Sequence, residues 1–264
     1  MKSLVKAQLL QRGFRVSTTT KPEQLDRFFA LMKPVTTNHA LVRVGGAGDG
    51  GYLVPDDLDG IAACFSPGVA ETAAFEENLA ARGIRCFLAD YSVERPPVLN
   101  ALFDFQKKFL GPHNDSIFMT LESWVRQSGV PDPADLVLQM DIEGAEYGVL
   151  LETPDELLKR FRVMVFEFHE LDALCDRHGF QVIYLTFVKL LKHFDIVHIH
   201  PNNYSPPVRY GRYEIPPLLE MTLLRKDRID RREPTRSFPH PLDATNVPEK
   251  EDFALPRCWF ESAR

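Results

Sequence analysis

The chain has 264 residues, of which 44% are hydrophobic and 26% are charged, a composition typical of a folded protein that argues against wholesale disorder. Its formal net charge of −6 supplies no electrostatic reason for a nucleic-acid partner, and we expect none. No stretch is long and apolar enough for a membrane span, and the first residues lack the clean apolar run of a secretory signal.

The chain divides into three regions by pattern. Residues 1–40 predict a helical N-terminal arm, because apolar residues recur at helical spacing after Pro22 and Pro34 ends the segment. Residues 41–228 alternate short apolar runs with helical stretches, which favours an α/β domain with a mostly parallel sheet and helices on both faces. Residues 229–264 are rich in charges and prolines and predict an extended tail lying on the domain.

The elements of the central region can be predicted in chain order. We expect strands at 61–66, 84–89, 117–120, 136–140, 163–168, 196–199 and 218–224. We expect helices at 71–82, 98–110, 145–151 and 177–194, and a loop at 200–207. In a doubly wound fold of this kind, a ligand lies across the carboxyl ends of the strands.

The four cysteines predict the redox state of the chain. Cys64, Cys86, Cys175 and Cys258 are far apart and form no CxxC pair. This spacing favours reduced thiols in a cytoplasmic protein over a zinc site or a disulfide framework.

A glycine-rich run at Gly46–Gly51 matches the GxGxxG pattern of dinucleotide-binding proteins. That motif needs a helix directly after it, so that helical amides face the pyrophosphate. Here residues 52–54 read as a strand, so a hairpin is the preferred interpretation. An NAD(P)-binding oxidoreductase remains the alternative that this run would support.

A second segment, residues 64–90, has the order strand, glycine turn, helix, strand and acid. Gly68 would let the backbone approach a ligand, and Asp90 at the end of the second strand suits two ribose hydroxyls. A single glycine favours a cofactor without a pyrophosphate, such as S-adenosylmethionine. The alternative is that Asp90 simply caps the next segment.

Three further segments carry a family resemblance. The chain contains LVLQMDIEGAEYGVL, which resembles the KIDVEGAE segment of FkbM-type methyltransferases. MTLESWV resembles the TLDSW element that precedes it there, and VMVFEFHEL resembles the strand that follows. The resemblance covers about residues 41–225, with Gln139 in place of the usual Lys and Glu122 in place of the usual Asp.

The resemblance implies a class I, Rossmann-like methyltransferase fold, S-adenosylmethionine as cofactor, and O-methylation. It gives Gly68 the cofactor turn, Asp90 the ribose, Glu122 the adenine edge, and Asp141 a place beside the transferred methyl group. The implied cofactor site comprises Ser66, Gly68, Glu71, Asp90, Tyr91, Glu122 and Asp141.

Methyl transfer to a hydroxyl requires a general base, or a divalent metal that acidifies the hydroxyl. Asp141, Glu143 and His169 are the catalytic candidates, since they follow predicted strands. Asp141, His169 and His200 are candidate ligands for Mg²⁺, Mn²⁺ or Zn²⁺. Both routes stay open.

Three nearby residues have simpler interpretations. His198 reads as a hydrogen-bonded core histidine, and Glu146 as a carboxylate of the first helical turn that could also face the cleft. Glu167 reads either as a buried paired acid or as a site residue.

The sequence therefore predicts S-adenosylmethionine-dependent O-methylation of a saccharide or another small molecule. A non-catalytic binding module on the same fold is a further alternative. The identity of the acceptor and the formation of a homo-oligomer stay open.

Overall fold

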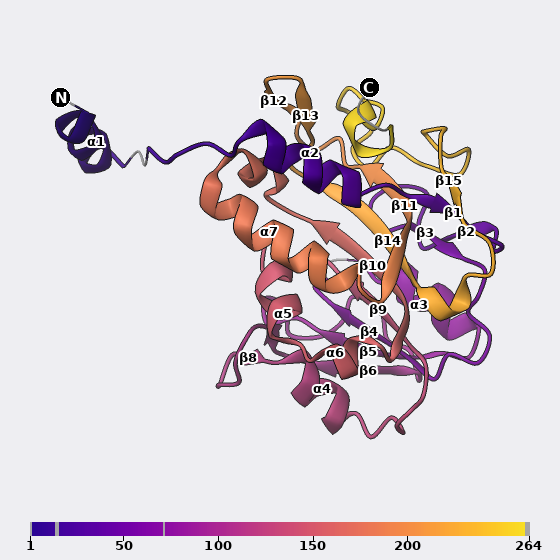
Figure 1. Cartoon of the computed structure of the whole chain (residues 1–264). Coiled ribbons are helices and arrows are strands. Elements are labelled where there is room, and N and C mark those ends of the chain that lie inside the picture. The colour runs from indigo at the N-terminus through magenta and orange to yellow at the C-terminus, as the bar shows by residue number, and fades with distance from the viewer. Residues whose placement is uncertain (1, 14–15, 71, 262–264) are drawn as a thin grey trace.

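The computed structural model describes residues 2–13, 16–70 and 72–261 (Figure 1). Its α-helices are α1 (Lys2–Gln11), α2 (Pro22–Leu31), α3 (Ala74–Ala81), α4 (Leu121–Gln127), α5 (Glu146–Glu152), α6 (Asp155–Leu158) and α7 (Arg177–Leu190). Its strands are β1 (Val35–Thr36), β2 (Leu41–Val44), β3 (Tyr52–Pro55), β4 (Ala63–Pro67), β5 (Arg85–Ala89), β6 (Phe103–Gln106), β7 (Phe109–Leu110), β8 (Phe118–Met119), β9 (Leu136–Met140), β10 (Phe161–Phe168), β11 (Phe194–Pro201), β12 (Val208–Tyr210), β13 (Tyr213–Ile215), β14 (Leu219–Arg225) and β15 (Glu233–Pro234). Three short 3₁₀ helices are η1 (Leu171–Cys175), η2 (Lys226–Arg228) and η3 (Arg257–Trp259).

The centre of the molecule is a seven-stranded sheet in the order β11-β14-β10-β9-β4-β5-β6. The neighbouring strands from β10 to β6 pair in parallel, whereas β14 runs antiparallel to both β10 and β11. The predicted α/β class with a mostly parallel sheet is thus confirmed. The antiparallel β14 separates β10 from β11, so these two strands are not neighbours.

The sheet is covered on both faces, which explains its continuous apolar strands. Leu138 and Met140 of β9 face a core shared with α2, α4, α5 and α7. Val137, which directly precedes Leu138 and points to the other face, belongs to a second core with α3 and the β2–β3 hairpin. Figure 1 shows α2 and α7 side by side over the first face.

Most of the predicted elements are present. The strand predicted at 136–140 matches β9, and the predictions at 84–89, 163–168 and 218–224 match β5, β10 and β14 within two residues. The helix predicted at 71–82 begins at Ala74, and β11 continues through Pro201 where a loop was expected.

The helix predicted at 98–110 is wrong, because this segment forms β6 and β7. Phe103 and Phe105 alternate with polar residues, and both pack against the second core. β5 offers an open edge there, with which residues 103–106 pair in parallel. Pairing along this edge satisfies backbone groups that a helix would leave on the sheet unpaired.

Segments from the two ends of the chain pack against each other. The fully buried Trp259 of η3 makes edge contacts with the rings of Phe28 and Phe29 on α2, at centroid distances of 6.1 and 5.1 Å. β1 and β15 also pair, joining residues 35–36 to residues 233–234. In the part of the chain that the structure describes, no helix is long and apolar enough to cross a membrane.

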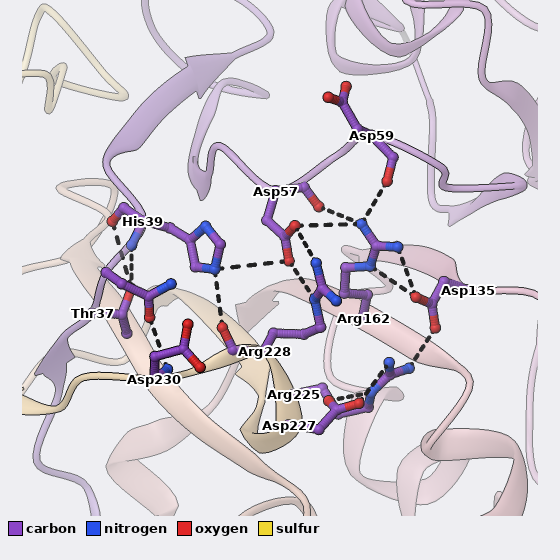
Figure 2. Close-up of polar contacts among 11 residues, drawn as sticks. Thr37, His39, Asp57, Asp59, Asp135, Arg162, Arg225, Asp227, Arg228 and Asp230 are labelled. Carbon is purple, nitrogen blue, oxygen red and sulfur yellow. Dashed lines mark hydrogen bonds and ion pairs between the residues drawn. The ribbon is translucent and has the colours of Figure 1, made fainter.

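A partly buried ion network ties the segment after β3 to the sheet (Figure 2). Arg162 of β10 donates to Asp135 Oδ2 from Nε at 2.9 Å and from Nη2 at 2.7 Å. Its Nη1 donates to the carbonyl oxygens of Asp57 and Asp59, at 3.0 and 2.7 Å. Burial opposes ionisation of both Asp57 and Asp135, yet their arginine partners hold the pKa of each below its ordinary value.

We expect Arg162→Met to lower the free energy of unfolding by about 2 kcal/mol, because it removes two hydrogen bonds to the Asp135 carboxylate and leaves the carbonyl oxygens of Asp57 and Asp59 without this donor. Urea unfolding at pH 7 measures this. The loss should shrink as the pH falls below about 4, since a depressed carboxyl pKa contributes stability only above its unfolded value. The matched control is Arg209→Met, which removes an exposed ion pair with Glu214 and should cost less than about 1 kcal/mol. Equal losses in the two variants would contradict this role of Arg162.

Candidate functional site

A cavity of about 520 Å³ opens at the carboxyl ends of β4, β5 and β9. This volume lies in the range of small-molecule sites. Its floor and walls come from the turn after β4, the segment after β9 and the loop of the β2–β3 hairpin. The described lining residues are Asp49, Gly50, Tyr52, Gly68, Val69, Ala70, Thr72, Phe75, Glu76, Asp90, Ser92, Phe109, Leu110, Phe118, Gln139, Asp141, Ile142, Glu143 and Ala145.

Gly68 stands where the chain after β4 passes the chain after β9. Its φ of +88° is one that side-chain-bearing residues rarely adopt, and a Cβ there would lie 1.6 Å from the carbonyl oxygen of Asp141. Glycine is therefore required for this close approach, which places both residues in the wall of the same cavity.

Asp90 lies at the end of β5, as predicted, and is almost fully buried. Its Oδ2 accepts a hydrogen bond from the backbone N–H of Ala70 at 3.0 Å. Its Oδ1 accepts bonds from the N–H and the hydroxyl of Ser92, both at 2.7 Å. Asp90 thus caps the segment that follows β5, the alternative considered above, and the same carboxylate also lines the cavity.

Not all of the predicted cofactor residues line the cavity. Ser66 is fully buried beneath it and hydrogen-bonds to Glu76 and Gln139, which do line it. Tyr91 packs its ring against Phe109 instead, with a centroid distance of 5.5 Å.

Two further predicted residues fall elsewhere. Glu122 is exposed on α4 and is not among the described lining residues, so the structure does not place it at an adenine edge of this cavity. Glu71 lies outside the described residues.

The cavity lining is acidic and aromatic. It includes the carboxylates of Asp49, Glu76, Asp90, Asp141 and Glu143. Its aromatic members are Tyr52, Phe75, Phe109 and Phe118. Among the described lining residues there is no lysine, arginine or histidine. Such a lining attracts cationic ligands and repels the phosphates of a dinucleotide.

Asp141 and His169 lie close together, as predicted, at the ends of neighbouring parallel strands. His169 Nε2 is 3.8 Å from Asp141 Oδ1 and 3.4 Å from Glu143 Oε2. The three ligand atoms lie within 4.8 Å of one another, a geometry that could also hold a metal ion. The three catalytic candidates therefore form one cluster at the edge of the cavity.

Glu146 joins this cluster from the first turn of α5 and is fully buried. Its Oε1 accepts hydrogen bonds from the backbone N–H groups of Ile142 and Gly144, at 3.0 and 3.2 Å. The same oxygen lies 3.2 Å from His169 Nδ1. Glu146 thus serves the first helical turn, as considered, but it is fully buried and is not among the described lining residues of the cavity; its contact with the imidazole of His169 was not predicted. The DIEGAE motif, with its glycine turn, was the sequence signal for this position.

The environment shifts the pKa of both central residues. Burial raises the pKa of Asp141 to about 7, against the attraction of His169 and with help from the charges of Glu143 and Glu146. Burial alone would lower the pKa of His169, but the hydrogen bond and charge of Glu146, with the charges of Glu167 and Asp141, raise it to about 9. Asp141 therefore exchanges its proton near neutral pH, as a general base should.

His200 is not part of this cluster, contrary to the predicted metal set. It lies on β11, and β14 stands between that strand and β10. Its Nδ1 lies 3.6 Å from Asp243 Oδ2 of the C-terminal segment. Oδ1 of the same Asp243 accepts a hydrogen bond from His198 Nε2 at 2.8 Å, so His198 is the hydrogen-bonded core histidine that was predicted.

A second acidic cluster was only partly predicted. Asp49, Glu167 and Glu220 bring carboxylate oxygens within 4.8 Å of one another. Burial raises the pKa of Glu220 to about 7 and that of Glu167 well above its ordinary value. Glu220 carries no local motif, and only its register opposite Glu167 across β10 and β14 brings it here.

The glycine-rich run forms the predicted hairpin loop. β2 and β3 pair antiparallel on either side of it, and no helix follows the run. Arg43 donates to the carbonyl oxygens of Gly46 and Gly48, at 2.7 and 2.8 Å. The loop places Asp49 and Gly50 in the cavity wall but lacks the helix that a pyrophosphate site requires.

The four cysteines are free thiols, as predicted.

No protein-family model matches the chain, and no curated protein matches it. The function is therefore argued from the geometry of the cavity.

Proposed function

We propose that the protein is an S-adenosylmethionine-dependent methyltransferase that methylates a hydroxyl group of a saccharide or another small molecule. The observation that carries the proposal is the acidic, aromatic cavity at the carboxyl ends of the strands, whose described lining holds no basic side chain. S-adenosylmethionine has a sulfonium and an ammonium group but no phosphate. Its charge is therefore complementary to this lining, whereas that of NAD(P) is not.

The strand order supports a Rossmann-like methyltransferase fold. Numbered in chain order, the seven strands of the sheet follow 3-2-1-4-5-7-6, with the seventh antiparallel. The order reverses at the first and fourth strands, β4 and β9, and the cavity opens at that point. Ligands of doubly wound sheets bind at such a reversal.

The lining residues fit the cofactor. Asp90 is a carboxylate that ribose hydroxyls can donate to, and Gly68 allows close approach to the backbone. Phe109 and Phe118, with ring centroids 5.9 Å apart, offer an apolar surface for a base. When bound, the cofactor supplies an electrophilic methyl group.

The residues at the cavity edge can prepare the acceptor. With a pKa near 7, Asp141 can take the proton of a bound hydroxyl. His169, raised to a pKa of about 9, carries a positive charge at neutral pH that stabilises the Asp141 carboxylate. Glu146 is a positioning residue, since its carboxylate fixes Nδ1 and leaves Nε2 facing Asp141 and Glu143.

The side chains of Asp141, Glu143 and His169 also fit a divalent metal, which would supply Lewis-acid activation of the hydroxyl. Glu146 would then orient the His169 ligand. Treatment with EDTA separates the routes: the base route predicts unchanged turnover at fixed acceptor, and the metal route predicts its loss.

The first test is ligand-dependent thermal stability. We expect S-adenosylhomocysteine at ~100 times its Kd to add roughly 2.7 kcal/mol and to raise the Tm by about 5–10 °C. NAD and NADP should leave the Tm unchanged. Asp90→Ala should reduce the shift in Tm. Glu122→Ala, at an exposed position of α4, should leave the shift unchanged.

The other outcomes favour the two alternatives. A shift with NAD alone would contradict the proposal and favour an oxidoreductase. The absence of a shift with every ligand would favour a non-catalytic binding module. A positive result leads to transfer of a labelled methyl group onto a panel of saccharides and hydroxylated small molecules.

A further inference from the structure

The second acidic cluster is built from three separate elements. Asp49 comes from the β2–β3 loop, Glu167 from the end of β10 and Glu220 from the start of β14. One carboxylate oxygen from each lies within 4.8 Å of the other two. The two glutamates are each only 5% exposed, so water screens their mutual repulsion poorly.

The cluster lies within a polar row across three adjacent strands. Glu167 is directly opposite Glu220, and Glu220 is directly opposite His200 of β11. Opposed residues of paired strands lie on the same face of the sheet, so the three side chains stand side by side. Apolar residues fill most of this sheet. A row of three buried ionisable side chains on adjacent strands is therefore an unusual polar site within it.

Asn246, from the C-terminal segment, reaches into the cluster and is 6% exposed. Its Nδ2 donates to a carboxylate oxygen of Glu220 and lies 3.4 Å from Asp49 Oδ1. Its buried Oδ1 has no hydrogen-bond partner among the described residues. Amide oxygen and nitrogen exchange places by a flip, which would turn Oδ1 towards the carboxylates as a cation ligand.

Other polar and charged groups surround the cluster. Asn202 donates to Glu167 Oε1 at 2.7 Å and so fixes the orientation of that carboxylate. Nε2 of His200, which is 5% exposed, lacks a hydrogen-bond partner in the described part of the chain, whereas its Nδ1 lies 3.6 Å from Asp243 Oδ2. The charges of His200 and Arg43 both act on Glu220, and Arg43 also donates to the carbonyl oxygens of Gly46 and Gly48.

We propose that Asp49, Glu167 and Glu220 bind a divalent cation, with Asn246 and His200 completing its surroundings. Carboxylate and amide oxygens are the ligands that Mg²⁺ and Mn²⁺ prefer. The cation would join the hairpin loop and the C-terminal segment to the sheet. This site shares no residue with the Asp141 cluster and does not depend on the proposed methyl transfer.

The test is a titration of EDTA-treated full-length protein with Mn²⁺, with free Mn²⁺ followed by electron paramagnetic resonance. We expect wild-type protein to bind Mn²⁺, and Glu220→Gln and Asp49→Asn each to weaken binding by roughly tenfold or more. Asp49 is exposed on its loop, so its substitution tests the site even if Glu220→Gln fails to fold. Glu249→Gln, at an exposed acid of the C-terminal segment, is the matched control and should bind as wild type.

Asp141→Asn distinguishes the two acidic clusters. We expect this variant still to bind Mn²⁺, and more tightly than Glu220→Gln and Asp49→Asn do, because its carboxylate is outside the proposed ligand set even though its charge acts on Glu167. Three results would overturn the proposal: no Mn²⁺ bound by wild-type protein, unchanged binding by Asp49→Asn, or loss of the ion from Asp141→Asn. The last result would assign the ion to the Asp141 cluster.

Discussion

Gly68→Ala is expected to lower the free energy of unfolding by roughly 3–5 kcal/mol and to abolish the thermal shift with S-adenosylhomocysteine. The φ of +88° costs a residue with a Cβ about 1–2 kcal/mol. The new Cβ would also lie 1.6 Å from a backbone oxygen of Asp141, and neither segment can yield without distorting the sheet. Relief of that overlap moves Asp141, and with it the wall of the cavity.

Gly83→Ala is the matched control for this variant. Gly83 has a similar φ of +80°, but nothing lies within 4 Å of its added Cβ. We expect a loss of about 1–2 kcal/mol and an unchanged ligand shift. Urea unfolding and thermal shifts on both variants measure the contrast, and equal losses would show that the contact with Asp141 is unimportant.

Asp141→Asn is expected to reduce kcat with a confirmed acceptor by roughly 10²–10⁴-fold, because the amide cannot accept the proton of the hydroxyl. Wild-type kcat/KM should rise with pH through about 7 and then level off, as Asp141 loses its own proton. The variant should lose this limb of the profile. Unchanged turnover in Asp141→Asn would remove Asp141 from the mechanism.

A measurement of stability distinguishes the expected loss of kcat in Asp141→Asn from misfolding of the variant. The folded pKa of Asp141, about 7, is above its unfolded value, so the native state binds more protons. Its contribution to stability therefore falls as the pH rises from about 4 to about 7. At pH 8 the Asn variant should be at least as stable as wild type, while its activity is lost. Glu156→Gln, at an exposed acid on α6, should change neither property.

Local patterns predicted the elements that surround the cavity. The apolar run of β9, the glycine turn at Gly68 and the DIEGAE motif each specify their structure within a few residues of sequence. The side chains after β9 and β10 therefore lie together as predicted, and so Asp141 and His169 form one cluster. Parallel pairing of β9 with β10 was enough to bring them to the same edge of the sheet.

The second cluster depends on pairings that local patterns do not contain. β14 is followed by no distinctive motif, and its antiparallel insertion between β10 and β11 is a long-range event. That insertion moves His200 away from His169 and brings Glu220 beside Glu167. Residues 98–110 were misassigned for a related reason, because an open sheet edge outweighed the helical spacing of their apolar residues.

The contact between Trp259 and the two phenylalanines of α2 also sets an order of assembly. During synthesis, Phe28 and Phe29 leave the ribosome long before Trp259 is made. This corner of the first core therefore closes only after η3 has been synthesised. A chain cut before residue 257 would lack the Trp259 contacts, although Phe28 would keep Phe187 and Phe29 would keep Tyr213 as ring partners, so this corner of the core would be more open to proteases.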